Sequence, residues 1–593
     1  MDIERPVNTR PGAREWGSDY LAELIRALDL KFIALTPGAS FRGLHDSLVN
    51  HLGNDNPRML LCLHEEHAVA IAHGYAKVTG RPMGAILHSN VGLMHASMAI
   101  FNAWCDRVPV LIFGATGAVD AARRRPWIEW IHTAKDQGAL IRDFTKWDDQ
   151  PASLAAAAES MLRAAMLAQT PPRAPVYVCF DVSLQEARIT EDLALPEIPR
   201  FQTPPEAAPS AAAVQRAAVL LARAKNPLIL AGRVSRDLQA WRQRVELAQA
   251  LNAKVLTDLK LGAAFPTEHP LHAAPPGIRL SEQGLQVLRQ ADVVLSLDWV
   301  DLAGTLKPVW PDAHVPAQII QCSVDSYIHR GWSMDYQGLP PMDVQLLCEP
   351  DVLVPLLLAE VGTQRGKIKS WVSAPKNILE PEVDAEIGIR VFGWLLQQAT
   401  AQEDVCLIRL PLGWAGDTCR FRHPLDYLGS DGGGGIGSGP GMAVGAALAL
   451  QGSGRLPAAV LGDGDFMMGV SAVWTAAHYR IPLLILVANN RSFFNDEIHQ
   501  EKVARQRARP VENKWIGQHI GDPDIDIAAI ARAQGALGWG PVASVRELNA
   551  ALPEAIAQVK AGHTCVVDVR VRPEYDETMA KGLVTELGHV EKR

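Results

Sequence analysis

Two polar clusters follow two neighbouring apolar runs late in the chain. Gly-Asp-Gly at 462–464 comes after PAAVL (457–461), and Asn-Asn at 489–490 comes after IPLLILVA (481–488). The intervening GVSAVWTAAHYR (469–480) has helical periodicity, so this stretch predicts a βαβ unit with two buried strands. A right-handed crossover makes the strands parallel, and their carboxyl ends then meet at the edge where open α/β sheets bind ligands.

The residues at this edge indicate an anion held together with a cation. Gly462 and Gly464 let the backbone approach a ligand closely, and the N-terminus of the following helix favours a negative group. The Asp463 carboxylate and the Asn490 amide are hard oxygen ligands that suit Mg²⁺. A diphosphate bound with Mg²⁺ is the simplest occupant. The alternative is a glycine-rich turn with an unrelated polar strand end, which either motif alone would favour.

The composition is compatible with a large enzyme. The 593 residues, of which 48% are hydrophobic, suffice for three or four domains. A net charge of −8 without a basic block argues against a nucleic-acid partner. No apolar run reaches the roughly eighteen residues of a membrane helix, and the start lacks a signal-peptide core, which predicts a cytoplasmic protein without membrane contact. The eight scattered cysteines form no C-x-x-C pair and predict buried free thiols.

Strand-like and helical segments alternate in three successive parts of the chain. KFIALTP and VPVLIFGAT belong to residues 1–190, and NPLILAG and ADVVLSLD belong to 206–362. A third part, 383–575, contains the opening motif and is followed by a tail at 576–593. The Pro-rich segment 193–211 predicts a linker, and GTQRGKIKSWVSAPKNILEPE marks a second change of character. The expected fold class is α/β, with three doubly wound parallel-sheet domains.

Glu65 stands where the strand-like MLLCLH gives way to an Ala-rich helix. In one interpretation, Glu65 and Glu66 simply favour the helix N-terminus electrostatically. In another, HEEH resembles the zinc-binding helix of metalloproteases. That motif needs histidines four residues apart, whereas His64 and His67 are three apart and have no evident third ligand.

In their order and spacing, several motifs resemble the thiamin-diphosphate decarboxylase and carboligase superfamily, which includes acetolactate synthases and benzoylformate decarboxylases. The resemblance rests on Gly-Asp-Gly and Asn-Asn, on TPGASFRGLHDSL, LHSNVG, NAWCDRVPVLIFGA and GGGGIGSGPG, and on Glu65 nine residues before Gly74. It implies an enzyme that uses thiamin diphosphate and Mg²⁺, with pyrimidine-binding, central and diphosphate-binding domains in that order. It also implies a homodimer or homotetramer in which Glu65 of one chain faces the diphosphate site of another.

The resemblance gives two residues catalytic roles. Glu65 would form a hydrogen bond with the aminopyrimidine N1′ and so promote loss of the C2 proton. This role requires a carboxyl group that can share a proton near neutral pH. The apolar AVAIA run beside it favours that protonated form. His88, in LHSNVG, aligns with an active-site histidine that could protonate the product carbon. A histidine that merely caps the next helix is the alternative.

The other assignments concern the cofactor and the metal. By family match, the Gly434 carbonyl would bind the 4′-amino group, and Ile436 would bend the cofactor into the V shape that brings its reacting atoms together. Gly464 and Asp465 would donate main-chain N–H groups to the diphosphate, next to Gly462. The expected metal ligands are Asp463 and Asn490 through their side chains and Ser492 through its carbonyl.

Some positions depart from benzoylformate decarboxylase. Ala39, with Ser40 beside it, replaces an active-site serine, and the second histidine of that enzyme has no counterpart in LSLDWVDLAGTLKP. Arg409 is expected to meet an anionic group, and the single glycine of AGRVSR predicts no flavin. The predicted function is non-oxidative decarboxylation of a 2-oxo acid through a C2 ylid and an enamine, with carboligation as a further outcome. The alternatives are an acetolactate-synthase-like carboligase, a 2-hydroxyacyl-CoA lyase and a non-catalytic cofactor-binding subunit.

Overall fold

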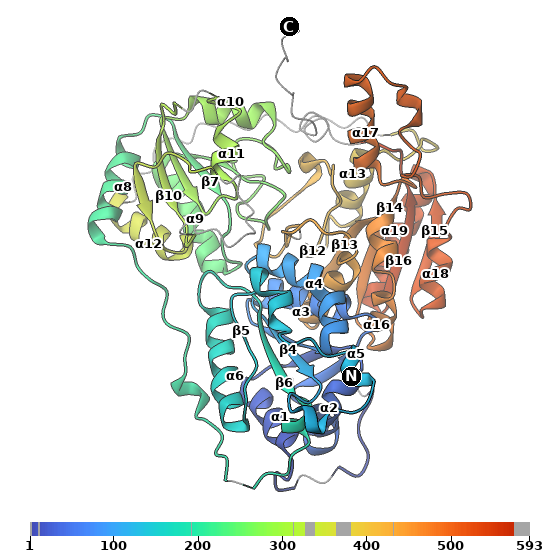
Figure 1. The fold of residues 1–593 in the computed structure, drawn as a ribbon. Coiled ribbons are helices and arrows are strands. Elements are labelled where there is room, and N and C mark those ends of the chain that lie inside the picture. Colours follow the sequence, from blue (N-terminus) through green and yellow to red (C-terminus); the bar gives the residue numbers. More distant parts are fainter. Residues whose placement is uncertain are drawn as a thin grey trace.

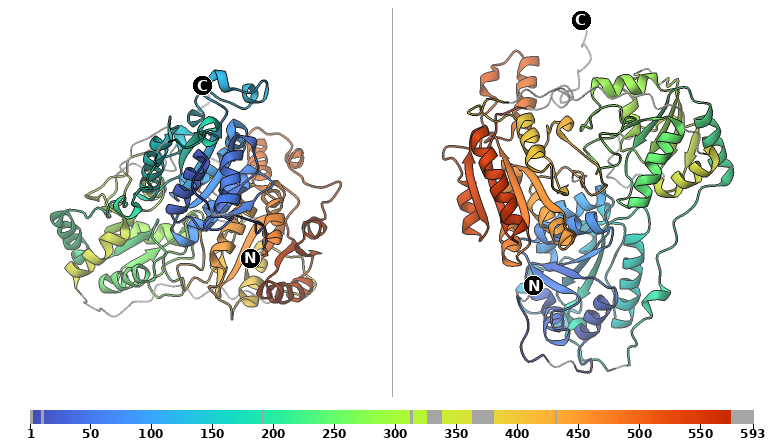
Figure 2. Two further views of the ribbon diagram at one scale, coloured as in Figure 1. Left: turned by 90° about the horizontal axis from the view of Figure 1, so that it is seen from below. Right: turned by 180° about the vertical axis from the view of Figure 1, so that it is seen from behind.

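Three α/β units make up the chain in the computed structural model (Figure 1, Figure 2). The structure describes residues 3–9, 12–190, 192–311, 314–325, 338–362, 381–430 and 432–574. The predicted tail at 576–593 lies outside these residues, as does most of GTQRGKIKSWVSAPKNILEPE. Each unit contains one parallel sheet, so the predicted α/β class with three parallel-sheet domains is confirmed. The exact domain boundaries stay predictions.

The N-terminal sheet has six parallel strands in the order β2-β1-β3-β4-β6-β5. Apart from the two-residue edge strand β5, its strands are mostly apolar, as expected of a parallel sheet with helices on both faces. The strands are Phe32–Leu35 (β1), Arg58–Leu61 (β2), Met83–His88 (β3), Val110–Thr116 (β4), Asp148–Asp149 (β5) and Val176–Asp181 (β6). The helices are Gly17–Ala27 (α1), Arg42–Asp46 (α2), Glu65–Thr79 (α3), Ser89–Cys105 (α4), Ile128–Ile131 (α5), Leu154–Gln169 (α6) and Val182–Gln185 (α7).

The central sheet has five parallel strands in the order β11-β10-β9-β7-β8. Most of its buried apolar residues form two cores within this unit, and Trp241, Leu259 and Ala263 also join the core of the C-terminal unit. The strands are Pro227–Ala231 (β7), Lys254–Leu256 (β8), Val293–Leu297 (β9), Gln318–Cys322 (β10) and Val344–Leu346 (β11). The helices are Ala211–Arg223 (α8), Leu238–Leu251 (α9), Glu282–Gln290 (α10), Leu302–Leu306 (α11) and Pro350–Val361 (α12).

The C-terminal sheet has the order β12-β13-β14-β16-β15, again with parallel pairing throughout the described strands. The strands are Val405–Leu407 (β12), Leu456–Gly462 (β13), Leu483–Asn489 (β14), Leu537–Val542 (β15) and Thr564–Arg570 (β16). The helices are Ile389–Ala399 (α13), Gly439–Leu450 (α14), Asp463–Met468 (α15), Ala472–His478 (α16), Phe494–Gln506 (α17), Ile527–Ala533 (α18) and Val545–Lys560 (α19).

The connection between β13 and β14 differs from the prediction. The sequence predicts one helix at 469–480, but the structure has two short helices, α15 and α16, separated by a break that begins at Gly469. The first of these helices, α15, starts at Asp463 itself, six residues earlier than predicted. Gly469 lies against the glycine-rich loop, because a Cβ there would be only 2.2 Å from the carbonyl oxygen of Gly437. This close approach explains why the chain interrupts its helix at a glycine.

Helices α3 and α14 join the N-terminal and C-terminal units. A Cβ on Gly74 would lie 2.0 Å from the Met442 carbonyl, and one on Gly445 would lie 1.9 Å from the Ile71 carbonyl. Only glycine permits such close backbone contact at these positions. Buried residues of both units form one continuous core around this helix pair. The start of α3, where Glu65 lies, is consequently fixed relative to the C-terminal sheet.

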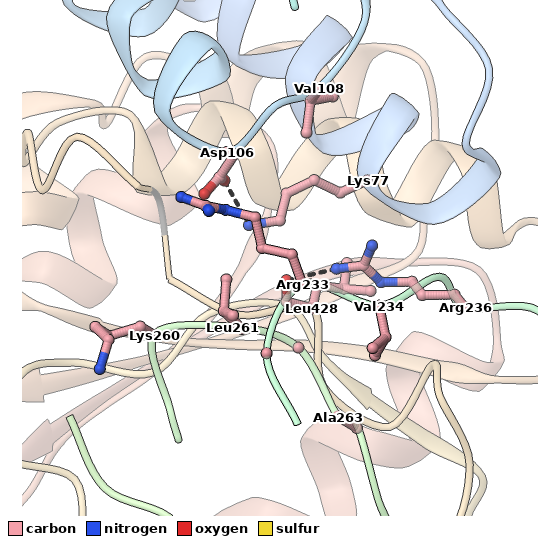
Figure 3. Close-up of a pocket in the computed structure, with 12 residues that line it drawn as sticks. Lys77, Asp106, Val108, Arg233, Val234, Arg236, Lys260, Leu261, Ala263 and Leu428 are labelled. Carbon is pink, nitrogen blue, oxygen red and sulfur yellow. Dashed lines mark hydrogen bonds and ion pairs between the residues drawn. The ribbon is translucent and has the colours of Figure 1, made fainter. Parts of the chain in front are cut away.

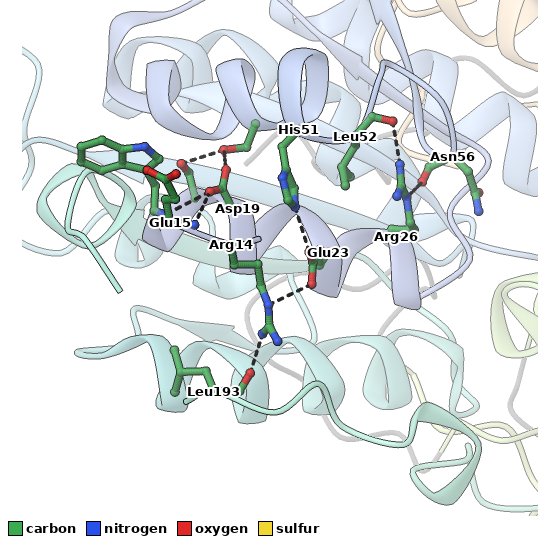
Figure 4. A network of polar contacts seen from close by, with 12 residues as sticks. Arg14, Glu15, Asp19, Glu23, Arg26, His51, Leu52, Asn56 and Leu193 are labelled. Atoms are coloured by element: carbon green, nitrogen blue, oxygen red, sulfur yellow. Dashed lines mark hydrogen bonds and ion pairs between the residues drawn. The ribbon is translucent and has the colours of Figure 1, made fainter. Parts of the chain in front are cut away.

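The predicted linker runs along the outside of the molecule from the N-terminal unit to α8 (Figure 1). Its first residues are tied to α1. The Arg14 guanidinium binds the carbonyl of Leu193 and pairs with Glu23 at 3.3 Å, and His51 lies 2.8 Å from the other Glu23 oxygen (Figure 4). These contacts anchor the linker where it leaves the domain.

Two further predictions concern membranes and thiols. Within the described residues, no helix combines the length and apolar character needed to cross a membrane. All eight cysteines are buried and unbridged, so the prediction of free thiols is confirmed.

Candidate active site

The carboxyl ends of β13 and β14 lie side by side, because the two strands pair in parallel up to Gly462 and Ala488. Asp463 follows directly as the first residue of α15 and is only 4% exposed. Across the edge, the Asn490 side-chain oxygen accepts a hydrogen bond from the Ser492 N–H at 3.0 Å. The structure thus brings together the residues predicted to hold the metal.

Asp463 has the properties expected of a metal ligand. One carboxylate oxygen, Oδ2, is buried and has no hydrogen-bond partner. Burial raises the pKa of Asp463 to about 6, although main-chain N–H groups of Gly464, Arg491 and Ser492 lower it. A buried, unpartnered carboxylate oxygen is costly, and a cation would compensate it. The residues at this edge therefore fit a divalent ion.

The Asp465 side chain makes contacts within the protein. Its Oδ1 accepts main-chain N–H bonds from Gly437 at 2.7 Å and Gly439 at 3.3 Å. Its Oδ2 pairs with the Arg409 guanidinium at 3.1 Å. The anionic group that Arg409 meets in the structure is therefore this carboxylate. The side chain of Asp465 fixes the glycine-rich loop against α15 and leaves the predicted diphosphate contact to its main chain.

The glycine-rich residues differ in what surrounds them. Gly434 has a positive φ of 66°, and no atom lies within 4 Å of the position that a Cβ would take. Ile436 is 38% exposed, so both residues face open space, as a cofactor contact requires. Gly462 is similarly open, whereas a Cβ on Gly464 would lie 2.6 Å from the Phe493 ring. Gly464 is thus required by the protein's own packing as well.

Glu65 lies at the first position of α3 and is 8% exposed. Its Oε2 is 3.0 Å from Nδ1 of His95 in α4, a residue that the sequence interpretation missed. The sequence did contain a signal for His95, since His88, Gly92 and His95 have the i, i+4, i+7 spacing of one helical face. Whether Glu65 faces the diphosphate site of a second chain stays a prediction.

The zinc alternative is not supported by His67, whose Nε2 lies 2.9 Å from the Ser471 hydroxyl. Burial lowers the pKa of His67 to about 4. Among the described residues, the one cluster of three side chains that could hold a metal ion is His64, Glu65 and His95. In this cluster His64 Nδ1 already accepts the Glu66 N–H at 3.2 Å and His95 Nδ1 already contacts Glu65. We therefore interpret it as a hydrogen-bonded group.

His88 ends β3 and occupies the N-cap position of α4, yet its side chain makes no capping hydrogen bond. The capping interpretation is therefore wrong. Its Nδ1 lies 2.9 Å from the Ser40 hydroxyl, so Ser40 rather than position 39 supplies the serine beside this histidine. Burial lowers the pKa of His88 and nearby His132 lowers it further, whereas Glu65 raises it. His88 is thus held mainly in its neutral form.

His132 is a second histidine that the sequence interpretation missed. Its ring lies 5.1 Å from the His88 ring in an edge-on arrangement. The Ser89 hydroxyl binds the His132 carbonyl and fixes this segment. No residue pattern around 132 indicated this, because the contact depends on how the segment after β4 folds back over β3.

A small cavity lies where the three units meet (Figure 3). Its volume is about 80 Å³, and its lining includes Lys77, Arg233 and Arg236. Lys77 pairs with Asp106 at 2.7 Å, and Arg236 donates to the Leu428 carbonyl at 2.8 Å. Sites for drug-sized ligands usually measure roughly 300–1,000 Å³. The expected lack of a flavin stays a prediction.

Sequence profiles of thiamine pyrophosphate enzymes match all three units. The N-terminal TPP binding domain matches residues 15–141, the central domain matches 214–327 and the C-terminal TPP binding domain matches 411–569. The chain belongs to the thiamine pyrophosphate enzyme family. The predicted superfamily is therefore confirmed, and its two outer units are domains that bind thiamine diphosphate.

Relatives within this family have different activities. Sulfoacetaldehyde acetyltransferase of Rhodobacter capsulatus is 26% identical over 89% of this chain and 90% of the relative. Benzoylformate decarboxylase of Pseudomonas aeruginosa is 26% identical over 84% of this chain and 90% of the relative. A solved 4-hydroxybenzoylformate decarboxylase from Rhodococcus jostii superposes with a TM-score of 0.75 at 21% identity, covering 95% of this chain and 100% of that one. This last likeness concerns the fold.

Proposed function

We propose that the chain is a thiamin-diphosphate- and Mg²⁺-dependent lyase that decarboxylates a 2-oxo acid to an aldehyde. The observation that carries this proposal is the buried, unpartnered Asp463 oxygen at the joint edge of β13 and β14. When bound, thiamin diphosphate supplies the electron sink that accepts the electrons released as CO₂ departs. Such chemistry needs a charged anchor, a proton acceptor and a proton donor from the protein.

The C-terminal unit would supply the anchor. Asp463 and Asn490 would bind Mg²⁺ through side-chain oxygens, and Ser492 through its main-chain carbonyl. Gly464 and Asp465 would hold the diphosphate with their N–H groups. Support comes from the raised pKa of Asp463, since an adjacent cation would favour the charged carboxylate that burial disfavours.

The N-terminal unit would manage protons. Glu65 would hold a proton in common with the pyrimidine N1′. His88 would move a proton through Nε2, because Nδ1 is already engaged by Ser40. Its largely neutral state suits a residue that must first accept the proton it later gives to the product carbon.

We further infer assembly into a homodimer or homotetramer with active sites between subunits, in the cytoplasm. Support comes from large apolar side chains that are exposed near the site: Leu63 at 50%, Met94 at 54% and Met468 at 58%. Exposed apolar surface of this kind is typical of protein interfaces. A sizing column coupled to light scattering would measure the mass, and a strictly monomeric active enzyme would contradict this inference.

A carboligase is the second candidate, whether acetolactate-synthase-like or a 2-hydroxyacyl-CoA lyase. It is favoured by the acetyltransferase and acetolactate synthase among the relatives. The experiment incubates the protein with thiamin diphosphate, Mg²⁺ and a panel of aromatic and branched 2-oxo acids, with and without an acceptor aldehyde. Aldehyde and CO₂ without acceptor support the decarboxylase, and hydroxyketone formed only with acceptor supports the carboligase. Bound cofactor without turnover of any substrate would indicate the non-catalytic subunit.

A further inference from the structure

His95 is a polar residue beside Glu65 whose role the proposed chemistry does not use. Its Nδ1 lies 3.0 Å from Glu65 Oε2. The His95 side chain is 51% exposed, whereas that of Glu65 is 11% exposed. The imidazole therefore stands at the open side of a carboxyl group that is otherwise enclosed.

The surroundings of this pair restrict both side chains. One turn before His95, a Cβ on Gly92 would lie 3.0 Å from Glu65 Cγ and 3.4 Å from its Oε1, so the α4 backbone lies against the glutamate. On its other side, the His95 ring stacks on His64 with centroids 5.1 Å apart and planes 19° apart. His64 is itself fixed, because it caps α3. The contact between His95 and Glu65 thus has a defined geometry.

We propose that His95 is a positioning residue that holds Oε2 of Glu65 and leaves Oε1 for N1′ of thiamin diphosphate. The inference rests on the proposed function. The terminal torsion of a glutamate has a broad energy profile, so a carboxyl group bound at one oxygen only can turn. A second bond from His95 removes that freedom before the cofactor binds, which is the general advantage of an ordered site.

The test compares His95→Asn with His95→Ala. The amide nitrogen of asparagine is two bonds from Cβ, like Nδ1 of histidine. Its N–H can therefore replace the imidazole contact. Alanine removes the contact. His51→Ala is the matched control, because His51 forms a histidine–glutamate pair with Glu23 at 2.8 Å in the same unit, away from α4 (Figure 4). Binding of thiamin diphosphate with Mg²⁺ is measured by calorimetry, alongside turnover of a 2-oxo acid.

We expect His95→Ala to weaken cofactor binding about 3- to 10-fold, the value of one hydrogen bond. It should lower kcat by about 10-fold and leave KM for the 2-oxo acid unchanged. His95→Asn should stay within about 3-fold of the unsubstituted protein, and His51→Ala should not differ from it. A cofactor analogue in which carbon replaces N1′ should bind all four proteins with equal affinity, because it cannot contact Glu65.

Three results would overturn the proposal, and a fourth would refute the proposed function on which it rests. If His95→Ala weakens binding of the cofactor and of the analogue by the same factor, the residue acts on the fold and not on Glu65. If His95→Asn is as impaired as His95→Ala, the contact at Oε2 is not what matters. Failure of the unsubstituted protein to bind thiamin diphosphate would refute the proposed function itself. If the unsubstituted protein binds thiamin diphosphate and His95→Ala binds it equally well, only this inference is refuted.

Discussion

The two halves of the candidate site differ in how far one chain completes them. At the end of β13, Asp463 keeps a buried oxygen without a partner, and burial raises its pKa to about 6. At the starts of α3 and α4, Glu65 is paired with His95 and His88 with Ser40. The C-terminal half needs a charge from outside the chain. The N-terminal half is organised by the protein's own hydrogen bonds.

The C-terminal half should therefore determine the stability of the ligand-free protein, and the N-terminal half should mainly determine the reaction rate. An unpartnered buried carboxylate destabilises the ligand-free protein, and bound Mg²⁺ would return that energy as binding. The paired groups carry no comparable cost, so changes to them should alter rates more than stability. Substitution of Asp463 should therefore change stability as well as activity, whereas substitutions in the N-terminal half should mainly lower rates.

Asp463→Asn tests the half with the unpartnered carboxylate and should have the broadest effect, because it changes both activity and stability. We expect activity to fall on the order of 100-fold or more, since the charged group proposed to bind the metal is lost. The ligand-free variant should nevertheless be more stable at neutral pH. The folded carboxyl has a pKa of about 6 against an ordinary 3.8, so the folded state binds the proton more tightly than the unfolded state.

The sign follows from this linkage. As pH rises from about 4 to 6, the unsubstituted protein should lose up to about 3 kcal/mol of stability that Asp463→Asn does not lose. Thermal unfolding of both proteins at pH 4.5 and 7.5, without cofactor, measures this. If the stability difference between the two proteins were the same at both pH values, the proposed cost of the Asp463 carboxylate would be contradicted.

Glu65→Gln tests the organised half. Catalysis should fall roughly 10²- to 10⁴-fold, because the glutamine amide cannot take up or release a proton as the carboxyl group can. Cofactor affinity should change little, since the amide keeps the shape of the side chain. Steady-state turnover and calorimetry measure the two quantities. Full turnover by this variant would remove Glu65 from the mechanism.

The His88 pair should give smaller losses. We expect His88→Ala to lower kcat about 100-fold and Ser40→Ala to lower it about 3- to 10-fold, the value of one hydrogen bond. Product analysis should show the loss at the aldehyde-forming step. If Ser40→Ala is more damaging than His88→Ala, the serine acts independently of the histidine.

Ala39→Ser should have the smallest effect. The structure places Ser40, not position 39, beside His88, so a hydroxyl at 39 should change kcat by less than about 2-fold. It should also fail to rescue Ser40→Ala in the double variant. Rescue would show that the serine position was correctly predicted from the sequence after all.

The sequence was most informative where chemistry and strand order coincide. Gly-Asp-Gly and Asn-Asn predicted the β13/β14 edge, because parallel strands must bring their carboxyl ends together. The break at Gly469 was not predicted, since it results from contact with Gly437 in a separate loop. His132 and the Ser40 partner of His88 were missed for the same reason, because both contacts depend on how separate segments pack. His95 was overlooked although its helical spacing from His88 indicated it.

The most direct test of the central claim is calorimetric titration of thiamin diphosphate into the ligand-free protein and into Asp463→Asn, with Mg²⁺ and with excess chelator. If the unpartnered Asp463 oxygen holds the ion that anchors the diphosphate, only the unsubstituted protein with Mg²⁺ should show saturable binding. Equal binding by Asp463→Asn, or by the unsubstituted protein in chelator, would contradict that claim.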